Sequence, residues 1–438
     1  ETQTLKLEKE FNYYTVKPKE GFYRLEKKLG VAQEDLISLN PILQSTGLQE
    51  GMILKIPLEQ TGDLKIEDDL LVEKNDLRDS IPFNSKVTLG LLLPFNANKI
   101  EFDSIEKTKT LLKKRNLHTL ALDFYSGVVM AVKEAGQLGI EVVLDVLDTQ
   151  NDKAYLQAEF KNRDWSNTDV LIGPMIPSNF DILSLQDSLS LIPMVAPLSS
   201  NPVISRPNVY QSVTSPELLR EKMFTYLNTV LDSTQNVLII TDTLNREVEN
   251  QLHNRFPFAQ ILRPEAGGYV VPDLIDSLLV DTLSNKVVFE SQNLGLIASV
   301  TSLLNSQVSK ERDVQLFTTF RSNAYDDSNI SKKQLGNLKF TYTAGAYSDE
   351  SNRSEEFDSL YVSSFGDLPK REALRGYDIT MDVILRFAHQ KQLRTDSIGE
   401  TEYIESRFDY VPNLNAGYQN RAFYLLEHSG YEVFEIKK

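Results

Sequence analysis

Short apolar runs alternate with helically spaced apolar residues along most of the chain, beginning near residue 86. Residues 87–93 are almost continuously apolar, which is typical of a parallel strand covered on both faces. A helix is predicted next, because apolar side chains recur every three or four positions at Phe124, Val128, Ala131, Val132 and Ala135. Further strands are predicted at 141–148, 170–172, 192–195, 237–240, 287–289, 314–317 and 340–342.

This alternation predicts the fold class of the large C-terminal region, which is α/β. Strand, helix and parallel strand form a right-handed unit, and repeated units build a parallel sheet with helices on its faces. The strands fall into two series, one ending near residue 195 and the other beginning near residue 237. We therefore predict two α/β lobes. The charged residues 96–120 look like an insertion in the first lobe.

Residues 13–57 form a separate small module. Leu25 and Leu29 lie on one face of a short helix, which Gly30 can end in a left-handed conformation. A second helix ends before Pro41, because the residue before proline avoids helical angles. The elements of the module, in the order β-α-α-β, are expected at 13–16, about 25–29, about 33–39 and 52–57.

Polar segments flank this module on both sides. Residues 1–12 are predicted to be a tether. Residues 58–85 contain many acidic and few aromatic residues, which favours a solvated acidic linker over a segment that binds a partner. Leu70, Leu71 and Val72 could add a short edge strand within this linker.

Charge and composition exclude several classes of function. The chain has 438 residues, a formal net charge of −16 and a sequence pI near 4.9. Nucleic-acid binding needs clustered Lys and Arg, and an acidic protein is repelled by anionic lipid, so we expect neither partner. No apolar run reaches the roughly 18 residues that a membrane span needs. Cys is absent, which removes disulfides, thiolate metal sites and thiol nucleophiles.

The sequence also lacks the compact motifs of common enzyme classes. It has no GxxxxGK[ST] phosphate-binding loop, no GxGxxG dinucleotide turn and no GxSxG nucleophile elbow. The histidines, which are far apart and show no metal-ligand spacing, are His118, His253, His389 and His428. We therefore expect no catalytic residue, no metal and no cofactor. A hydrolase stays an alternative, because a glycosidase needs only two carboxylates and the chain has 62 acidic residues.

The N-terminal module resembles a LysM domain, the small fold that binds N-acetylglucosamine chains in peptidoglycan or chitin. The resemblance rests on Tyr14-Thr15-Val16-Lys17-Pro18, Leu25, Lys28, Gly30-Val31, Leu36, Leu39-Asn40-Pro41 and Leu48 to Pro57. It implies a sugar groove lined by two loops, whose residues here are Glu20, Gly21, Phe22, Tyr23, Pro41, Ile42 and Leu43. Gly21 would permit close backbone approach to the sugar, and Phe22 or Ile42 could supply an apolar floor. The family usually has Gly-Asp-Thr-Leu where this chain has Lys-Glu-Gly-Phe, so a hydroxyl is missing at Gly21.

The remainder, about 86–438, resembles the type I periplasmic binding proteins, the fold of branched-chain amino-acid receptors. The resemblance rests on segments in family order: Phe124 to Val132, Gly139 to Val142, Asp148 to Asp152, Val170 to Pro174, Ile192 to Pro202 and Arg375 to Asp378. It implies two lobes joined by three crossovers, lobe 1 at about 86–212 and 342–392 and lobe 2 at about 213–341 and 393–438. The same fold occurs, without transport, in outer-membrane lipoproteins that activate peptidoglycan synthases.

The resemblance also implies a ligand cleft between the lobes. In lobe 1, the residues whose hydroxyl or amide groups would face a ligand carboxylate are Ser178, Asn179, Ser199 and Ser200. In lobe 2, Asp242 and Glu290 stand where amino-acid receptors usually carry Tyr-Gly and tyrosine. Half of the cleft chemistry is therefore altered. We expect a cleft that is vestigial or filled by a protein segment, and a free amino acid or other small polar ligand is the alternative.

Together these resemblances predict a non-catalytic, wall-associated protein of the bacterial periplasm. Peptidoglycan is the expected partner of the LysM module. The body would act as a scaffold or regulator of envelope or cell-wall assembly, with an envelope protein as its partner. The alternatives are a solute-binding receptor of an importer and a cell-wall hydrolase. The chain begins without Met or an apolar leader, so we expect a processed product whose missing part could carry an outer-membrane lipoprotein anchor.

Overall fold

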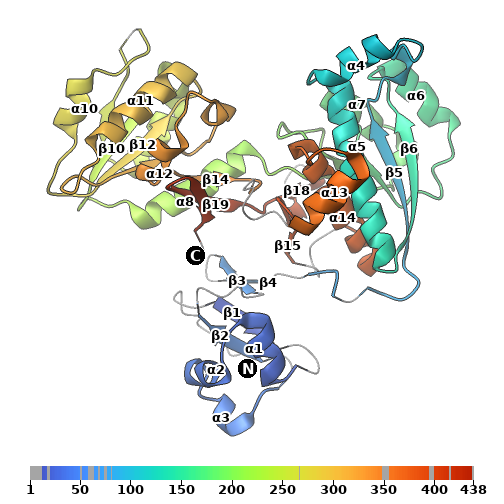
Figure 1. Cartoon of the computed structure of the whole chain (residues 1–438), viewed down its shortest axis with the longest axis horizontal. Helices are drawn as coiled ribbons and strands as arrows, with labels where there is room; N and C mark the ends of the chain where they lie inside the picture. The colour runs from blue at the N-terminus through green and yellow to red at the C-terminus, as the bar shows by residue number, and fades with distance from the viewer. Residues whose placement is uncertain are drawn as a thin grey trace. The chain divides into compact units, whose positions relative to one another are not determined.

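The computed structural model describes residues 12–16, 20–49, 52–57, 64–67, 70–73, 76–79, 81–265, 267–347, 355–393, 399–413 and 416–436. The chain divides into two compact units, and Figure 1 labels many of their helices and strands. Unit 1 contains the residues up to 212 together with 355–420, and unit 2 contains 213–354 together with 421–436. Among the described residues, no helix is both long and apolar enough to cross a membrane.

The N-terminal module has the predicted β-α-α-β order, with one additional helical turn. Its elements are β1 (Asn12–Thr15), α1 (Phe22–Leu29), α2 (Gln33–Leu39), α3 (Leu43–Thr46) and β2 (Ile53–Ile56). β1 and β2 pair antiparallel, and a small core that includes Tyr14, Leu25, Leu36 and Ile56 lies between the sheet and the helices. Gly30 ends α1 at a φ of 64°, in the left-handed conformation that the sequence predicted.

A hairpin extends the sheet of this module into the segment predicted as an acidic linker. β3 (Leu64–Glu67) pairs antiparallel with β1, and β4 (Leu70–Glu73) pairs antiparallel with β3, so that the sheet order is β2-β1-β3-β4. The apolar residues at 64, 66 and 70–72 separate this hairpin in composition from its acidic surroundings. Most of the predicted N-terminal tether, residues 1–11, lies outside the described residues.

Unit 1 also contains a mostly parallel sheet in the order β17-β18-β9-β8-β7-β5-β6. Its strands are β5 (Lys86–Leu93), β6 (Glu141–Asp148), β7 (Val170–Ile172), β8 (Met194–Ala196), β9 (Val209–Gln211), β17 (Tyr410–Pro412) and β18 (Tyr418–Asn420). Only the pairing of β17 with β18 is antiparallel among these described strands. The strands predicted at 141–148 and 170–172 are confirmed.

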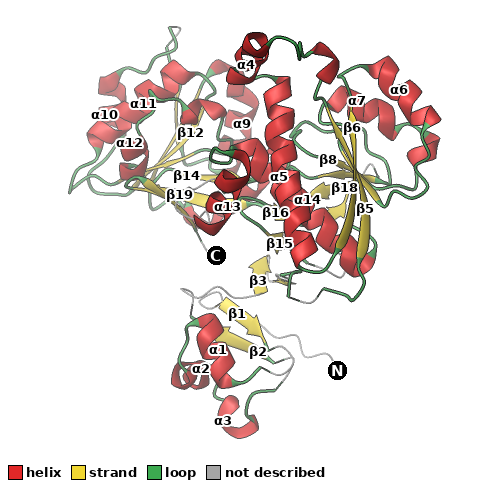
Figure 2. Ribbon diagram, turned by 45° about the vertical axis from the view of Figure 1, so that its right-hand side comes forward, coloured by secondary structure: helices red, strands yellow, loops and turns green. Residues whose placement is uncertain are grey.

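Helices cover both faces of the unit 1 sheet (Figure 2). α5 (Leu117–Gln137) and α14 (Arg371–Gln390) pack on the face that carries Leu91, whereas α6 (Lys153–Asn162) and α7 (Pro177–Ser184) pack on the face that carries Leu92. Successive side chains of a strand point to opposite faces, so a strand covered on both sides is apolar throughout. The remaining helices of unit 1 are η1 (Ala97–Lys99), α4 (Ile105–Lys113), η2 (Asp187–Leu189) and α13 (Glu355–Phe365).

Unit 2 repeats this α/β architecture with the strand order β11-β10-β12-β13-β14-β19-β20. Its strands are β10 (Asn236–Thr241), β11 (Gln260–Leu262), β12 (Asn285–Glu290), β13 (Val314–Phe317), β14 (Thr341–Ala344), β19 (Tyr424–Ser429) and β20 (Glu432–Glu435). Its helices are α8 (Pro216–Val230), η3 (Thr243–Asn245), α9 (Arg246–Arg255), α10 (Pro272–Leu278), α11 (Leu294–Gln307), η4 (Asn323–Asp326) and α12 (Lys332–Asn337). The α10–α11 side and the α8–α9 side each bury a separate apolar cluster against the sheet.

The chain passes between the units at residues 212, 354 and 420. The first position agrees with the sequence-based division, whereas the other two lie later than the predicted positions, 341 and 392. β14 belongs to unit 2 because it pairs with β13 and β19. The hairpin of β15 (Thr401–Glu402) and β16 (Arg407–Phe408) belongs to unit 1, where the Asp378 carboxylate of α14 accepts the N–H groups of Ile404 and Glu405.

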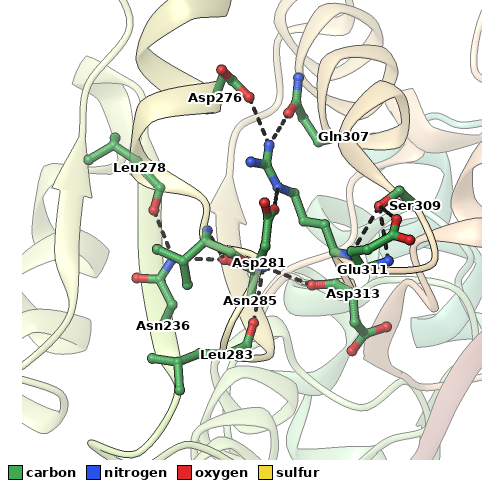
Figure 3. A network of polar contacts seen from close by, with 12 residues as sticks. Asn236, Asp276, Leu278, Asp281, Leu283, Asn285, Gln307, Ser309, Glu311 and Asp313 are labelled. Carbon is green, nitrogen blue, oxygen red and sulfur yellow. Dashed lines mark hydrogen bonds and ion pairs between the residues drawn. The ribbon is translucent and has the colours of Figure 1, made fainter.

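A polar network at the N-terminal ends of the unit 2 strands holds their starting points together (Figure 3). Asn285 is buried; its amide donates to the carbonyls of Val280 and Asp313, and its side-chain oxygen accepts from the amide of Asn236. Next to it, the Arg312 guanidinium pairs with Asp276 and Asp281 on either side. The N-terminal ends of the unit 2 strands are therefore held by hydrogen bonds and ion pairs between side chains of the chain itself. The candidate site residues of unit 2 lie at the opposite ends of these strands.

Candidate functional site

The structure sorts the predicted sugar-groove residues of the N-terminal module into exposed and buried ones. Tyr23 and Ile42 are 75% and 61% exposed, unusually high for large apolar side chains. Leu43 is buried in the core of the module, and Phe22 is partly buried and packs against that core. An added Cβ at Gly21 would meet no atom within 4 Å, which leaves its backbone approachable.

Two buried polar side chains hold the loops that carry these residues. The Tyr14 hydroxyl donates to the Glu20 carboxylate at 2.8 Å and so ties the first loop to β1. The amide of Asn40 donates to the carbonyls of Leu36 and Lys55, and its oxygen accepts the Lys55 N–H. Asn40 thereby joins the end of α2 to β2. The sequence identified both residues only as parts of a motif. Their hydrogen-bond partners, which lie 6 and 15 residues away, could not be predicted from it.

The C-terminal edge of the unit 1 sheet brings the four lobe 1 candidates onto neighbouring loops. Asn179 is buried and donates to the side-chain oxygen of Asn151 at 3.0 Å, whereas Ser178 is exposed at the start of α7. The Ser199 hydroxyl donates to the carbonyl of Asn201 within its own loop, and Ser200 is exposed. Among the four candidates, Ser178 and Ser200 are therefore the ones whose side chains are exposed.

The same edge contains a carboxylate that sequence reasoning did not select. Asp148, at the end of β6, accepts backbone N–H groups from Asn96, Ala97 and Gln150. It thus fastens the loop after β5 to the loop after β6. The only signal in the sequence is the Asp-Thr-Gln-Asn-Asp segment in which it lies, and that segment does not reveal which backbone groups it binds.

In unit 2, the Asp242 carboxylate at the end of β10 is bonded by the chain itself. The Ser291 hydroxyl donates to one of its oxygens at 2.7 Å, and the Asn245 amide donates to the other at 2.9 Å. These contacts tie the loop after β10 to the loop after β12. Beside them, Leu244 is exposed at the tip of η3.

Glu290, the last residue of β12, is buried inside unit 2. Its carboxylate accepts the backbone N–H of Thr319 and the hydroxyl of Thr318, and Arg220 lies close by with its Nε bonded to the Thr319 hydroxyl. Burial raises the pKa of Glu290 from its ordinary value of 4.5 to about 7, against the lowering effect of these hydrogen bonds. The side chain therefore links two strand ends, and near pH 7 its neutral and charged forms are populated to a similar extent.

Replacing Glu290 by glutamine is expected to reduce the pH dependence of unit 2 stability. A carboxyl whose pKa is raised on folding stabilises the fold below pH 4.5, and this contribution is lost as pH rises through about 7. The shift corresponds to up to about 3 kcal/mol. Urea unfolding followed by circular dichroism at pH 5 and pH 8.5 should show a smaller loss for Glu290→Gln than for wild type. Exposed Glu311→Gln is the control, and equal losses in all three proteins would contradict the assignment.

Metal chemistry finds no support in the part of the chain that the structure describes. No group of three or more His, Asp or Glu side chains there is arranged to hold a metal ion. His428 is buried beside Phe340 and Tyr342, and burial together with the positive charges of Arg321 and Lys332 lowers its pKa to about 4. It is therefore a neutral packing residue at neutral pH.

Comparison with known proteins identifies the two parts of the chain separately. Residues 14–57 match the LysM domain family, and no curated protein matches the chain as a whole. A branched-chain amino acid ABC transporter structure from Rhodospirillum rubrum has a TM-score of 0.53 at 13% identity, over 80% of this chain and 100% of that chain. LpoA from Haemophilus influenzae has a TM-score of 0.51 at 15% identity, over 82% of this chain and 60% of LpoA.

At such low identities these similarities establish the fold and nothing more. The chain spans only 60% of the LpoA chain that it matches. The mostly parallel sheets of units 1 and 2, each with helices on both faces, agree with the matched structures. Residues 14–57 are therefore a LysM domain, and the body that follows has the two-lobed fold of the type I periplasmic binding proteins.

Proposed function

We propose that this chain is a non-catalytic, peptidoglycan-associated protein of the bacterial periplasm, whose body acts as a scaffold or regulator in envelope or cell-wall assembly. The observation that carries the proposal is the fusion of a LysM domain to a binding-protein-like body. LysM domains suggest peptidoglycan binding, and the fold similarity to LpoA fits an envelope regulator. Both folds in general serve binding and not catalysis.

The LysM domain is proposed to bind N-acetylglucosamine chains through its exposed residues. Sugar rings present apolar faces that pack on aromatic and aliphatic side chains, while backbone groups bind their hydroxyls. Tyr23 and Ile42 are the large apolar side chains exposed at the two predicted loops, and Gly21 leaves its backbone open. The Tyr14–Glu20 contact and Asn40 keep these loops in place.

Replacing both Tyr23 and Ile42 by serine is expected to weaken retention on purified sacculi by at least about tenfold. Each side chain would bury apolar surface against the sugar, and losing two such contacts costs on the order of 2 kcal/mol. A pelleting assay with the intact protein measures the retained fraction. Ile53→Ser is the matched control, because Ile53 is a partly exposed apolar residue of the same module outside both loops. Equal retention of the double variant and wild type would remove the glycan role.

The body is proposed to bind a protein and not a free solute. This is supported by the unit 2 acids that stand at the ligand positions of the fold. Both oxygens of Asp242 and one oxygen of Glu290 accept hydrogen bonds from neighbouring residues of the same chain. A ligand ammonium group would have to displace these bonds. Binding of the body to a protein partner would also increase the apparent affinity of the LysM domain for the wall, because both binding sites are on one chain and the second binding event is intramolecular.

Isolation of the intact protein from detergent-solubilised envelopes tests the scaffold role. A stoichiometric protein partner is the expected result, and its recovery should fall when peptidoglycan binding is removed by the Tyr23 and Ile42 substitutions. The absence of any stoichiometric partner would count against a scaffold. Incubation with sacculi should release no soluble fragments, and released fragments would favour the hydrolase instead.

A solute receptor is the second candidate, because the similarity to the Rhodospirillum rubrum transporter structure covers that whole chain. Its ligand would be an amino acid or another small polar molecule held at the strand ends by Ser199 and Ser200. A ligand that binds only the folded protein raises its melting temperature by mass action. A thermal-shift screen with amino acids and muropeptides distinguishes the candidates, since only a receptor gives a shift that the Ser199→Ala, Ser200→Ala double variant abolishes.

A further inference from the structure

The insertion between β5 and α5 contains a helix that does not contribute to the core of unit 1. α4 has no buried residue, although it contains three leucine or isoleucine side chains. Phe102 is 76% exposed, Ile105 is 69% exposed and Leu112 is 43% exposed. Ile105 and Leu112 are seven residues apart and lie on the same face of α4, and Phe102 lies in the turn before the helix. Packing within unit 1 does not explain these three exposed apolar side chains.

The same segment is basic in an otherwise acidic chain. Residues 99–115 contain six basic and three acidic residues, a net charge of +3, whereas the whole chain carries −16. Lys107 pairs with Glu101, and Arg115 pairs with Glu372 at 2.6 Å, which anchors the end of the segment to α14. Lys113 and Lys114 form no ion pair with another described residue. Their charge is available to a partner.

We propose that residues 99–115 form a docking surface for a bilayer that carries anionic phospholipid headgroups. A short basic helix with exposed Ile and Leu, preceded by an exposed Phe, is suited to the boundary between headgroups and acyl chains, where apolar side chains insert and lysines bind phosphates. A protein partner would have to supply a shaped groove with an acidic rim, whereas a bilayer accepts three protruding side chains without shape complementarity. Charge complementarity and protrusion together favour the lipid surface.

This proposal revises the expectation that the acidic chain avoids anionic lipid. Repulsion from the rest of the chain acts over a Debye length of about 8 Å at physiological salt, so a local basic surface can bind where the net charge suggests repulsion. At long range, the electrostatic interaction with a membrane depends on the net charge of −16. At contact, it depends on the +3 charge of this segment.

Vesicle sedimentation of the intact protein tests the proposal. The protein should pellet with vesicles of phosphatidylglycerol and phosphatidylethanolamine but not with phosphatidylcholine vesicles, and 0.5 M NaCl should reduce binding strongly. The Lys113→Glu, Lys114→Glu variant should lower the partition coefficient at least about tenfold. The Phe102→Ser, Ile105→Ser variant should lower it by a similar factor while leaving sacculus retention unchanged.

Matched controls separate docking from general changes in charge or apolarity. Lys153→Glu with Lys161→Glu reverses two exposed lysines of α6, and Leu191→Ser removes an exposed apolar side chain of unit 1. Both should bind the anionic vesicles like wild type, and circular dichroism should show that all variants are folded. No sedimentation of the wild-type protein with anionic vesicles, or equal loss in the controls, overturns the proposal. If the wild-type protein does not sediment with anionic vesicles, a protein partner with an acidic groove becomes the remaining candidate for binding this surface.

Discussion

Alanine at position 127 is expected to lower the free energy of unfolding of unit 1 by at least about 3 kcal/mol. α5 and α14 cross in close contact, with a glycine from each helix at the crossing. A Cβ atom at Gly127 would lie 1.8 Å from the carbonyl oxygen of Ala373, and a Cβ at Gly376 would lie 2.1 Å from that of Phe124. Because both obstacles are backbone atoms, no side-chain rotation relieves the overlap, and the helices must move apart.

A second glycine of the same helix provides the control for this prediction. An added Cβ at Gly136 would meet no atom within 4 Å, so Gly136→Ala should be neutral or stabilising by up to about 1 kcal/mol through helix propensity. Trp165, the single tryptophan, is buried in unit 1 against Phe160, so its fluorescence during urea unfolding reports on this unit. Similar midpoints for Gly127→Ala and Gly136→Ala would refute the close crossing.

Leucine at position 382 is expected to destabilise unit 1 by about 3–5 kcal/mol. Asp382 and Arg386 form an ion pair on α14 in which both side chains are fully buried. The Arg386 guanidinium also donates to the Thr401 hydroxyl and to the Phe408 carbonyl, and so holds the β15–β16 hairpin. Burial raises the pKa of Asp382, which is opposed by the charge of Arg386. Without Asp382, the arginine keeps its charge and loses its counter-ion in the core.

Removing both charges should cost much less than removing one. The Asp382→Leu, Arg386→Met variant has no unpaired charge in the core, so it should recover most of the lost stability, measured by the same fluorescence transition. Glu141→Gln breaks the exposed pair with Lys86 and should cost less than about 1 kcal/mol. If the double variant is as unstable as Asp382→Leu, the hairpin contacts and not the uncompensated charge determine the effect.

The architecture was predictable where local pattern decides the structure. Strands buried on both faces produce apolar runs, so β6, β7 and β13 were located to the residue from the sequence. The LysM domain was found because its short elements and the Asn-Pro stop lie within one contiguous segment. In these cases every residue needed for the inference lies close by in the sequence.

The candidate sites were less predictable because their geometry depends on residues distant in the sequence. In the sequence Glu290 resembles a ligand-facing acid, and its burial becomes evident only when Thr318 and Thr319, which follow β13, are placed beside it. The passages between units depend in the same way on distant pairing, since β19, which lies near the end of the chain, pairs with β14 and so assigns it to unit 2. The exposure of Ile105 likewise could not be predicted, because the same helical spacing of apolar residues is found on buried helix faces.

The hairpin of β3 and β4 has a practical consequence for dissecting the molecule. A fragment that stops at residue 57 contains every segment of the family match, yet it leaves one side of β1 without its neighbouring strand. An open strand edge of this kind invites pairing with other molecules. Isolated LysM fragments should therefore end after residue 73, and aggregation of a shorter fragment would result from the missing strand and not from an intrinsic instability of the LysM fold.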